Sequence, residues 1–154
     1  YINVQSYVIY KGDKMRVNQN ISFLHKPCTN VSPNEINGIK SRLFTFLLNN
    51  KDKAVGIAAN QLNINKRAFA INVDNKIEIF INPVIELSGD VVDNTEGCLS
   101  IPNKQFNVKR RMNVSIKADN IFKSKGYRGW YAYVIQHEMD HINGILISDK
   151  GEDQ

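Results

Sequence analysis

The stretch that decides the fold is WYAYVIQHEMDHI, residues Trp130–Ile142. Its apolar residues recur at the spacing of one helical face, which predicts a helix that packs in the protein core. Gly144 follows closely, and glycine commonly ends a helix because it adopts a left-handed backbone conformation at little cost. We therefore expect a core helix from Trp130 to Ile142.

Residues 137–141 of this helix read H-E-x-x-H. Residues four apart lie on one helical face, so His137 and His141 can both direct a ring nitrogen at one metal ion, with Glu138 beside them as a proton carrier. The alternative is a solvated helix that carries two histidines by chance. Two of the three histidines in the chain fall in this pattern, and the third, His25, is expected to take no part. The helix therefore indicates a hydrolytic metal site.

A catalytic metal usually has three protein ligands, so a third ligand is needed. In one large class of metalloproteases it is a downstream histidine, in the pattern H-E-x-x-H-x-x-G-x-x-H. Gly144 fits that extension, but Ile147 stands where its last histidine should be. Upstream, residues 96–100 read EGCLS, and the Cys98 thiolate would be a good ligand for zinc or ferrous iron. Alone, Cys98 would more often be a buried small hydrophobe; beside a histidine pair, the ligand is favoured.

A third informative piece is the small-residue run AVGIAANQ, residues 54–61. In it, Gly56 allows the close approach of a ligand and Gln61 offers an amide donor. By itself this run could equally be tight packing between a helix and a sheet, with Gln61 exposed. Its function depends on the other two pieces.

Together the three pieces resemble the three signature motifs of the peptide deformylase family, in the same order and at compatible separations. The second, E-G-C-x-S, and the third, Q-H-E-x-D-H, are complete, whereas the first, G-x-G-x-A-A-x-Q, departs at Ala54, where the family usually has glycine. The resemblance runs from roughly Leu24 to Asp149. It is closest to short members, similar to those of some phages, that lack the further C-terminal helix linked to ribosome contact.

The resemblance implies a metal-dependent hydrolase that removes the N-formyl group from the formylmethionine of nascent polypeptides and releases formate. One divalent ion, natively ferrous iron and replaceable by zinc or nickel, would be bound by Cys98, His137 and His141. Glu138 would take a proton from the attacking water and later protonate the departing amine. The Gln61 amide and the Leu99 backbone N–H would stabilise the oxyanion.

The resemblance also implies where the formylmethionyl peptide binds. Gly56 and its neighbour Val55 would contact the substrate backbone. Trp130, Tyr133 and Val134 would line the pocket for the methionine side chain, although ordinary core packing is an equal alternative for these three.

Three further positions lie near the motifs. Glu96 and Asp140 are expected to be structural supports that bond a basic or backbone partner near the ligands. Gln105 stands where many relatives have an arginine near the substrate path, which implies altered contacts beyond the first substrate residue.

The remaining patterns predict an α+β fold. We expect one peptide-deformylase-like domain over residues 1–154, in which the H-E-x-x-H helix is surrounded by antiparallel or mixed sheets and one helix lies in the N-terminal half. Capping residues predict the start of that N-terminal helix, and alternating apolar residues predict the strands. The predicted elements are strand and loop over 1–31, a helix starting at 32–35 and ending near 49, and strands at 67–73, 77–81, 84–87, 91–92 and 107–122.

Composition agrees with an ordinary globular domain, since 42% of the 154 residues are hydrophobic and 23% are charged. The net charge of +5 is spread along the chain and predicts weak ribosome association at most, with no specific nucleic-acid binding. No apolar run could cross a bilayer and no secretory signal is recognisable. We expect a monomer without a membrane partner, reduced Cys28 and Cys98, and a location in the cytoplasm of a bacterial or phage-infected cell, with an organelle as the alternative.

Two other functions remain open at this point. A metalloprotease that cuts internal peptide bonds would share the helix and Glu138, but the missing downstream ligand and the intact EGCLS segment disfavour it. A noncatalytic metal-binding or ribosome-associated module is disfavoured by Glu138 and Gln61, because a structural metal needs neither residue and is usually closed by four ligands.

Overall fold

The computed structural model describes residues 16–153. Its helices are α1 (Ile21–Leu24), α2 (Ile36–Asn49), α3 (Trp130–Ile142) and α4 (Ile147–Lys150), with 3₁₀ turns at Pro33–Glu35 and Ala59–Leu62. One antiparallel sheet contains β1 (Gly56–Ala58), β2 (Ala68–Val73) and β3 (Lys76–Ile81). The other contains β4 (Val84–Cys98), β5 (Ile101–Lys117) and β6 (Lys125–Arg128), and β7 (Glu152–Asp153) also pairs with β5. The predicted α+β class is confirmed.

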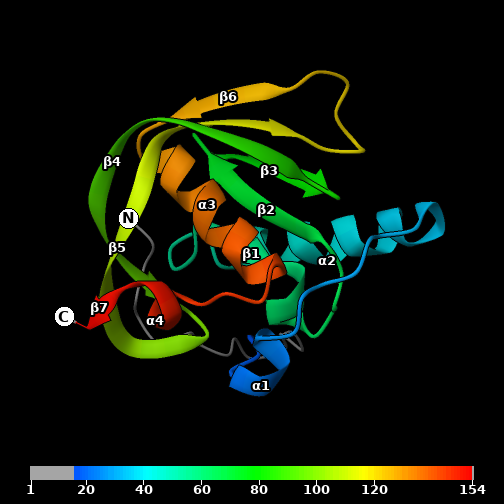
Figure 1. Cartoon of the computed structure of the whole chain (residues 1–154). Coiled ribbons are helices and arrows are strands. Elements are labelled where there is room, and N and C mark those ends of the chain that lie inside the picture. The colour runs from blue at the N-terminus through cyan, green and yellow to red at the C-terminus, as the bar shows by residue number, and fades with distance from the viewer. Residues whose placement is uncertain (1–15, 154) are drawn as a thin grey trace.

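Helix α3 lies in the middle of the molecule and packs against strands of both sheets (Figure 1). Its bounds are those predicted. Its apolar side chains, among them Val134 and Ile135, form one core cluster with Phe69 and Phe80 of the first sheet and Ile116 of the second. Full burial of each such side chain stabilises the fold by about 1.5–3 kcal/mol. The helix is therefore fixed in place from two sides.

Helix α2 covers the other face of the β1–β3 sheet. Its buried residues, including Leu43 and Leu47, pack with Ala68 and Ala70 of β2. The intervening residue Phe69 points instead toward α3, because successive strand side chains alternate between the two faces. The first sheet is thus a layer between two helices, and the predicted helix with one sheet-packing face is confirmed.

The strand predictions were partly wrong. The turn between β2 and β3 is at Asp74 and Asn75, as predicted, and both have positive φ, 50° and 65°. By contrast, the predicted short strands at 84–87 and 91–92 are parts of the single strand β4. The register of β4 against β5 shifts between Ser88 and Val91, because a β-bulge there interrupts the alternation.

Two other boundaries also differ from the prediction. The strand expected at 107–122 is β5, which begins earlier and ends earlier, at Ile101–Lys117. In the segment predicted as strand and loop, Ile21–Leu24 forms a short helix because the Asn20 side chain caps it, and residues 1–15 lie outside the described range.

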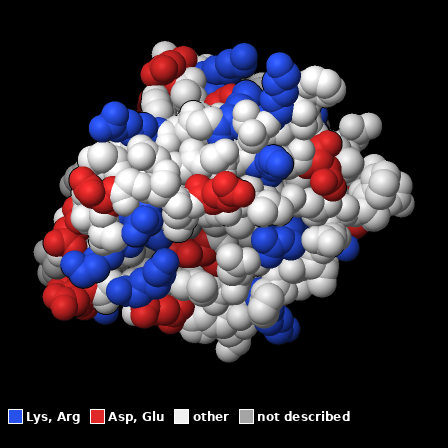
Figure 2. Space-filling model, turned by 45° about the horizontal axis from the view of Figure 1, so that its top comes forward, with Lys and Arg blue, Asp and Glu red and all other residues white. Residues whose placement is uncertain are grey.

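Surface and thiol properties agree with the composition. Basic and acidic side chains are interspersed over the face shown in Figure 2. Cys28 and Cys98 are both free and buried. Within residues 16–153, the helices are too short or too polar to cross a membrane.

Gly144 supports a test of how α3 ends. Its φ is +77°, and a Cβ added there would lie 2.5 Å from the His25 carbonyl oxygen. We expect Gly144→Ala to lower the free energy of unfolding by about 1–3 kcal/mol or more, because a side chain is strained in this conformation. Midpoints of urea unfolding measure the effect.

The matched control is Gly38→Ala in α2, where an added Cβ meets nothing within 4 Å. It should raise stability by about 0.5–1 kcal/mol, since alanine is the better helix former. If both variants unfold at the same urea concentration, Gly144 does not have the role described.

Candidate active site

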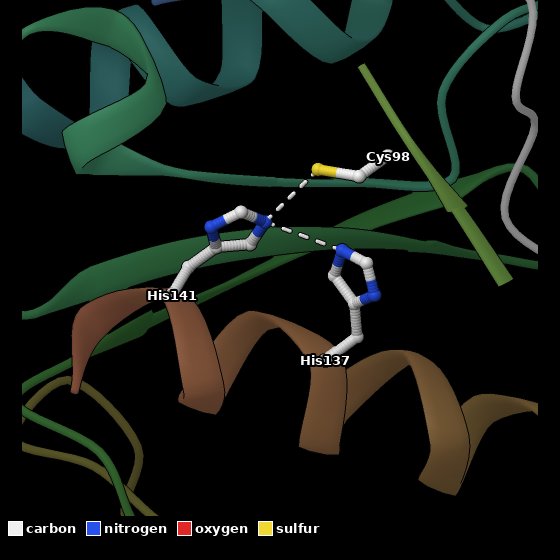
Figure 3. A group of neighbouring side chains, drawn as sticks. All are labelled: Cys98, His137 and His141. Carbon is white, nitrogen blue, oxygen red and sulfur yellow. Dashed lines mark hydrogen bonds between the residues drawn. The ribbon is translucent and has the colours of Figure 1, made fainter. Parts of the chain in front are cut away.

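Three potential metal ligands converge where β4 ends beside α3 (Figure 3). The Cys98 Sγ lies 3.3 Å from His141 Nε2, which in turn lies 3.2 Å from His137 Nε2. All three ligand atoms fall within 4.8 Å of one another, and all three residues are buried. An ion with bonds of about 2.0–2.3 Å can reach three atoms at such separations. The predicted ligands are therefore brought together.

Neighbouring groups orient the histidine rings. The His137 Nδ1 lies 2.9 Å from Glu96 Oε1, so the ring presents its Nε2 to the cluster. Burial lowers the pKa of His141 well below its usual value, and His137 lowers it further. Neutral imidazole is the form that binds metal. The donors and their orientation fit one divalent ion.

His137 is shifted toward its protonated form when no metal is bound. Burial opposes its charged form, but hydrogen bonds to Cys98 and Glu96 outweigh burial and raise its pKa to about 10. Because a metal ligand must be unprotonated, metal binding at His137 is coupled to proton release.

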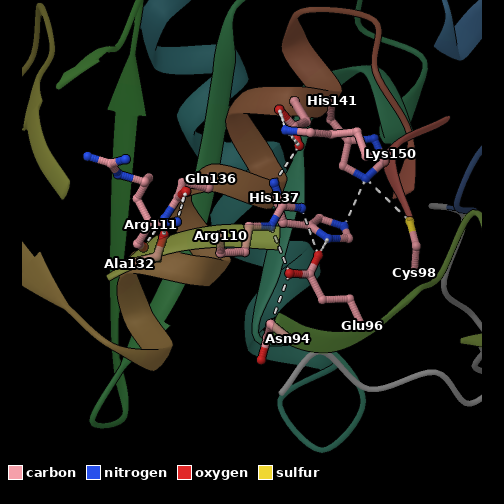
Figure 4. Close-up of polar contacts among 11 residues, drawn as sticks. Asn94, Glu96, Cys98, Arg110, Arg111, Ala132, Gln136, His137, His141 and Lys150 are labelled. Atoms are coloured by element: carbon pink, nitrogen blue, oxygen red, sulfur yellow. Dashed lines mark hydrogen bonds and ion pairs between the residues drawn. The ribbon is translucent and has the colours of Figure 1, made fainter. Parts of the chain in front are cut away.

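Behind the ligands lies a buried ion-pair network centred on Arg110 (Figure 4). The Arg110 Nη2 and Nε each donate to a Glu96 carboxylate oxygen at 2.8 Å, and its Nη1 donates to Asp140 at 2.6 Å. Burial alone would raise the pKa of Glu96, but Arg110 and His137 outweigh burial and keep it well below its usual range. Arg110 thus joins β4 and β5 to α3, and Glu96 and Asp140 make the supporting contacts expected of them.

Sequence reasoning did not identify Arg110, which is one of three consecutive cations at 109–111. The available signal was its parity along β5. Val108, Val114 and Ile116 are also buried even-numbered positions, whereas Lys109 is exposed. The predicted strand at 107–122 already places Arg110 on the same face as Val114 and Ile116, so parity could have found it.

Glu138 lies on α3 beside the ligands. It is 1% exposed, and its Oε1 is buried without a hydrogen-bond partner among the described residues. Burial raises its pKa to about 7, with His137 acting in the opposite direction. A Cβ added to Gly56 would lie 2.6 Å from Glu138 Oε2. The missing side chain of Gly56 therefore leaves room for this carboxylate.

Gln61 faces the cluster from the 3₁₀ turn after β1. Its Oε1 accepts from the Ala58 N–H at 3.0 Å, while its Nε2 donates to Ser100 at 3.1 Å and to the Cys98 Sγ at 3.6 Å. Gln61 is buried, so the alternative of an exposed side chain was wrong. Leu99, in the turn after Cys98, is buried as well.

Asn60 makes a further contact near the ligands that the sequence did not predict. Its Nδ2 donates to the backbone carbonyl of His141 at 2.8 Å. Because this contact joins the first motif to the end of the ligand helix, Asn60 helps to fix the position of His141. No spacing or charge pattern in the sequence marks it out.

The chain resembles known proteins in sequence over most of its length. The family model for polypeptide deformylase matches residues 15–154. The chain belongs to the polypeptide deformylase family. The peptide deformylase of Carboxydothermus hydrogenoformans is 37% identical over 131 residues, covering 82% of this chain and 84% of that protein. The peptide deformylase of Wigglesworthia glossinidia brevipalpis is 36% identical over 158 residues, covering 96% and 95%.

The fold is also that of solved deformylases. The crystal structure of a peptide deformylase from Synechococcus elongatus in complex with actinonin aligns with a TM-score of 0.81 and 30% identity, covering 100% of this chain and 87% of that one. Deformylases are metal-dependent hydrolases, and the cluster of Cys98, His137 and His141 could hold such a metal. The activity of this chain is removal of the formyl group from nascent polypeptides.

Of the residues predicted to contact the substrate, only some line the same cleft in the structure. Val55 and Trp130 line one cleft of about 320 Å³ at the start of α3. Val134 is fully buried and lies beside Gly56, where an added Cβ would be 3.2 Å from its Cγ1. Tyr133 is half-buried and does not line that cleft.

The Arg110 network predicts a coupled loss of stability and metal affinity. Arg110→Met leaves the Glu96 carboxylate buried without its cation, which should cost about 3–5 kcal/mol of unfolding free energy. Loss of the support behind His137 should also weaken metal binding about 10–100-fold. Denaturant unfolding and competition with a chelator measure the two effects.

Two variants make this test specific. Arg111→Met removes the neighbouring exposed cation and should change neither property. Glu96→Gln combined with Arg110→Met should recover part of the stability, because it removes the unpaired buried charge. Equal effects of Arg110→Met and Arg111→Met would rule out the network as the cause.

Proposed function

We propose that deformylation takes place at the cluster of Cys98, His137 and His141, in a single catalytic domain spanning residues 1–154. The observation that carries the proposal is the buried Glu138 carboxylate, which has an unpartnered oxygen, next to three ligand atoms within 4.8 Å of one another. A divalent ion bound there supplies a Lewis acid that polarises the formyl carbonyl and lowers the pKa of water. A thiolate and two imidazoles suit ferrous iron or zinc, and we assign iron as the native ion, with zinc or nickel as replacements.

Glu138 is the proposed proton carrier. Its free Oε1 can accept a proton from water as the oxygen attacks the formyl carbon, and the same group can then deliver the proton to the departing amine. Gly56 is part of this arrangement, since any larger residue would displace the carboxylate. A structural metal site would require neither residue.

Gln61 and Leu99 are the proposed oxyanion donors. The Gln61 Nε2 carries two N–H groups, and it already lies 3.6 Å from the Cys98 Sγ, so it can donate to a substrate oxygen next to the ligands. The Leu99 backbone N–H lies in the turn that follows Cys98. In other enzymes one such donor contributes about 2.7–4 kcal/mol to the transition state.

The substrate peptide is proposed to extend the first sheet. Among the described strands β1 pairs only with β2, so its second edge can bond an extended formylmethionyl peptide. The Val55 carbonyl accepts from the Asn72 N–H on the β2 side, so the Gly56 N–H is the proposed donor to the peptide, with Val55 in contact beside it. Trp130, Tyr133 and Val134, at the N-terminal end of α3, are the proposed contacts of the methionine side chain.

The cellular setting follows from the activity and the charge. We propose a monomer that acts in the cytoplasm of a bacterial or phage-infected cell, or in an organelle, where formylated chains are made. The net charge of +5 supports weak association with the ribosome.

The first experiment is formate release from formyl-Met-Ala-Ser by anaerobically prepared protein loaded with ferrous iron, nickel or zinc. We expect metal-dependent turnover that is lost in Cys98→Ala, because that variant removes one ligand. Absence of formate with every ion, from folded and metal-loaded protein, would contradict the proposed site and favour a noncatalytic metal module.

Glu138→Gln tests the proton carrier without changing side-chain shape. The variant should keep its metal, measured by elemental analysis, but lose about 10²–10⁴ in kcat, since the amide cannot accept the proton. Glu86→Gln, on the exposed part of β4, is the matched control and should turn over normally. Near-normal kcat in Glu138→Gln would refute the assigned role.

Gly56→Ala tests the same carboxylate from the other side. The added Cβ displaces Glu138 and should lower kcat by about 10²-fold, because small misplacements of a catalytic group are costly. Metal content should be unchanged. If Gly56→Ala retains full kcat, the packing of Glu138 against Gly56 has no part in turnover.

A further inference from the structure

Although Lys and Arg occur along the whole chain, their excess over Asp and Glu lies mainly in one segment. Residues 101–128, which form β5, β6 and the turn between them, contain eight Lys and Arg but one Asp. The whole chain carries a net charge of only +5, so the remaining residues are slightly acidic. The basic character of this protein is therefore a property of the β5–β6 hairpin, although the charges are interspersed with acidic groups when the whole face is viewed (Figure 2).

Part of this charge has no acidic partner. Lys109 and Lys125 form ion pairs with Asp93 and Glu78. In contrast, within residues 16–153 no carboxylate pairs with Arg111, Lys117 or Arg128, whose side chains are all exposed. Among the described residues, the Arg128 guanidinium contacts the Met112 sulfur at 3.8 Å.

The three unpaired cations lie on the outer face of the sheet, away from α3. Side chains alternate along β5, and since Val114 and Ile116 are buried against α3, Arg111 and Lys117 point outward. The register places Arg128 of β6 opposite Asn113 of β5, on the same face. Arg111 and Arg128 are thus diagonal neighbours, about 7–8 Å apart, and Lys117 lies about 20 Å from Arg111 along the strand.

Two depressions lie on this face between Arg128 and Lys117, and together they form a shallow groove with both polar and apolar walls. One depression, of about 330 Å³, is lined by Ser88, Asn113, Ser115 and Arg128 among others. A second, of about 270 Å³, is lined by Val84, Glu86, Ser115, Lys117 and Ser124. The two meet at Ser115. The groove therefore offers hydroxyl and amide groups between positive charges, with Glu86 as its one acidic residue.

An aromatic side chain stands at the tip of the same hairpin. Phe122 is 98% exposed, in the turn that precedes β6, and Lys123 and Lys125 follow it. This turn projects beyond the other strands at the top right of Figure 1. A phenylalanine without any cover gains nothing for the fold, whereas an exposed ring among cations is the combination on which unpaired bases stack.

We propose that the outer face of the β5–β6 hairpin binds single-stranded RNA without sequence preference. Arg111, Arg128 and Lys117 contact successive parts of the phosphate backbone along the groove, and Phe122 stacks on an unpaired base. RNA is favoured over DNA because the substrate of the family, a nascent chain, is made on RNA. Only this preference rests on the proposed deformylase activity.

A membrane surface fits the same residues less well. A flat bilayer could touch the tip at Phe122, but Arg111 lies far back along the sheet, and one inserted ring gives only weak anchoring. A flexible strand, by contrast, can follow the groove from Lys117 to Arg128 and reach Arg111 beside it. The spacing of the cations along β5 therefore favours a flexible single strand of nucleic acid over a membrane surface.

The test uses the full chain and a short unstructured RNA labelled with a fluorophore, with binding followed by anisotropy over a range of salt concentrations. Arg111→Gln combined with Arg128→Gln should lower the slope of log K against log salt by about 1.4, since each phosphate contact to a single strand contributes about 0.7. The charge-matched control is Lys26→Gln combined with Lys76→Gln, two exposed lysines outside the hairpin, which should leave the slope unchanged.

Phe122→Ser should weaken RNA binding about tenfold with the same salt slope, because it removes a stacked base but no charge. Phe44→Ser, on the exposed side of α2, is its control. All these variants should keep their formate release and unfolding midpoints. Glu138→Gln should bind RNA like the unchanged protein, so failure of the deformylase mechanism and failure of this proposal are distinguishable.

Three results would overturn the proposal. The first is an equal loss of RNA affinity in the hairpin and control variants, which would show that binding depends on the net charge and not on the hairpin. The second is Phe122-dependent binding to phosphatidylserine vesicles in the absence of RNA binding. The third is binding to DNA of the same sequence as tight as to RNA, which would remove the assignment to RNA.

Discussion

Arg110 and Glu96 form a buried ion pair on which the positions of His137 and of the ligand helix depend. Both side chains are almost wholly removed from solvent, and each would be costly to bury alone. Through Glu96 the pair orients His137, and through Asp140 it attaches the ligand helix to the second sheet. Because neither charge can be left unpaired in the interior, α3 cannot slide along β5 without a large loss of free energy. The ligand geometry is therefore a consequence of charge pairing in the core.

The opposite side of α3 is set by close packing rather than by charge. The first sheet lies between α2 and α3, and its edge strand β1 begins at the glycine that leaves room for the Glu138 carboxylate. Gln61 and Asn60 follow in the next turn, one facing Cys98 and the other bonded to the end of the helix. Strand β5 thus serves both the deformylase site and the basic hairpin. Its buried face supports the ligands, and its outer face carries the unpaired cations.

The errors of sequence reasoning came from residues whose neighbours are distant in the chain. The bulge at Ser88–Val91 interrupts a long strand that alternation alone divides into two. Parity along the predicted strand puts Arg110 on the buried face, but its partners Glu96 and Asp140 lie on other elements, so no local pattern indicated that a charge could be buried there. Gln61 could be taken for an exposed amide, because its partners are far along the chain, Cys98 at the end of β4 and Ser100 in the turn that follows.

The sequence by itself determined the ligand helix, its two histidines four residues apart, its end at Ile142 just before Gly144, and the family to which the chain belongs. These features are local: helical periodicity, spacing on one helical face and short motifs depend on residues close together in the chain. Only the tertiary structure decided that Cys98 meets the histidines, that Arg110 is the buried cation behind them, and that Gly56 accommodates Glu138. Those contacts join residues dozens of positions apart, and their partners are selected by packing and by the cost of an unpaired buried charge, which no local pattern records.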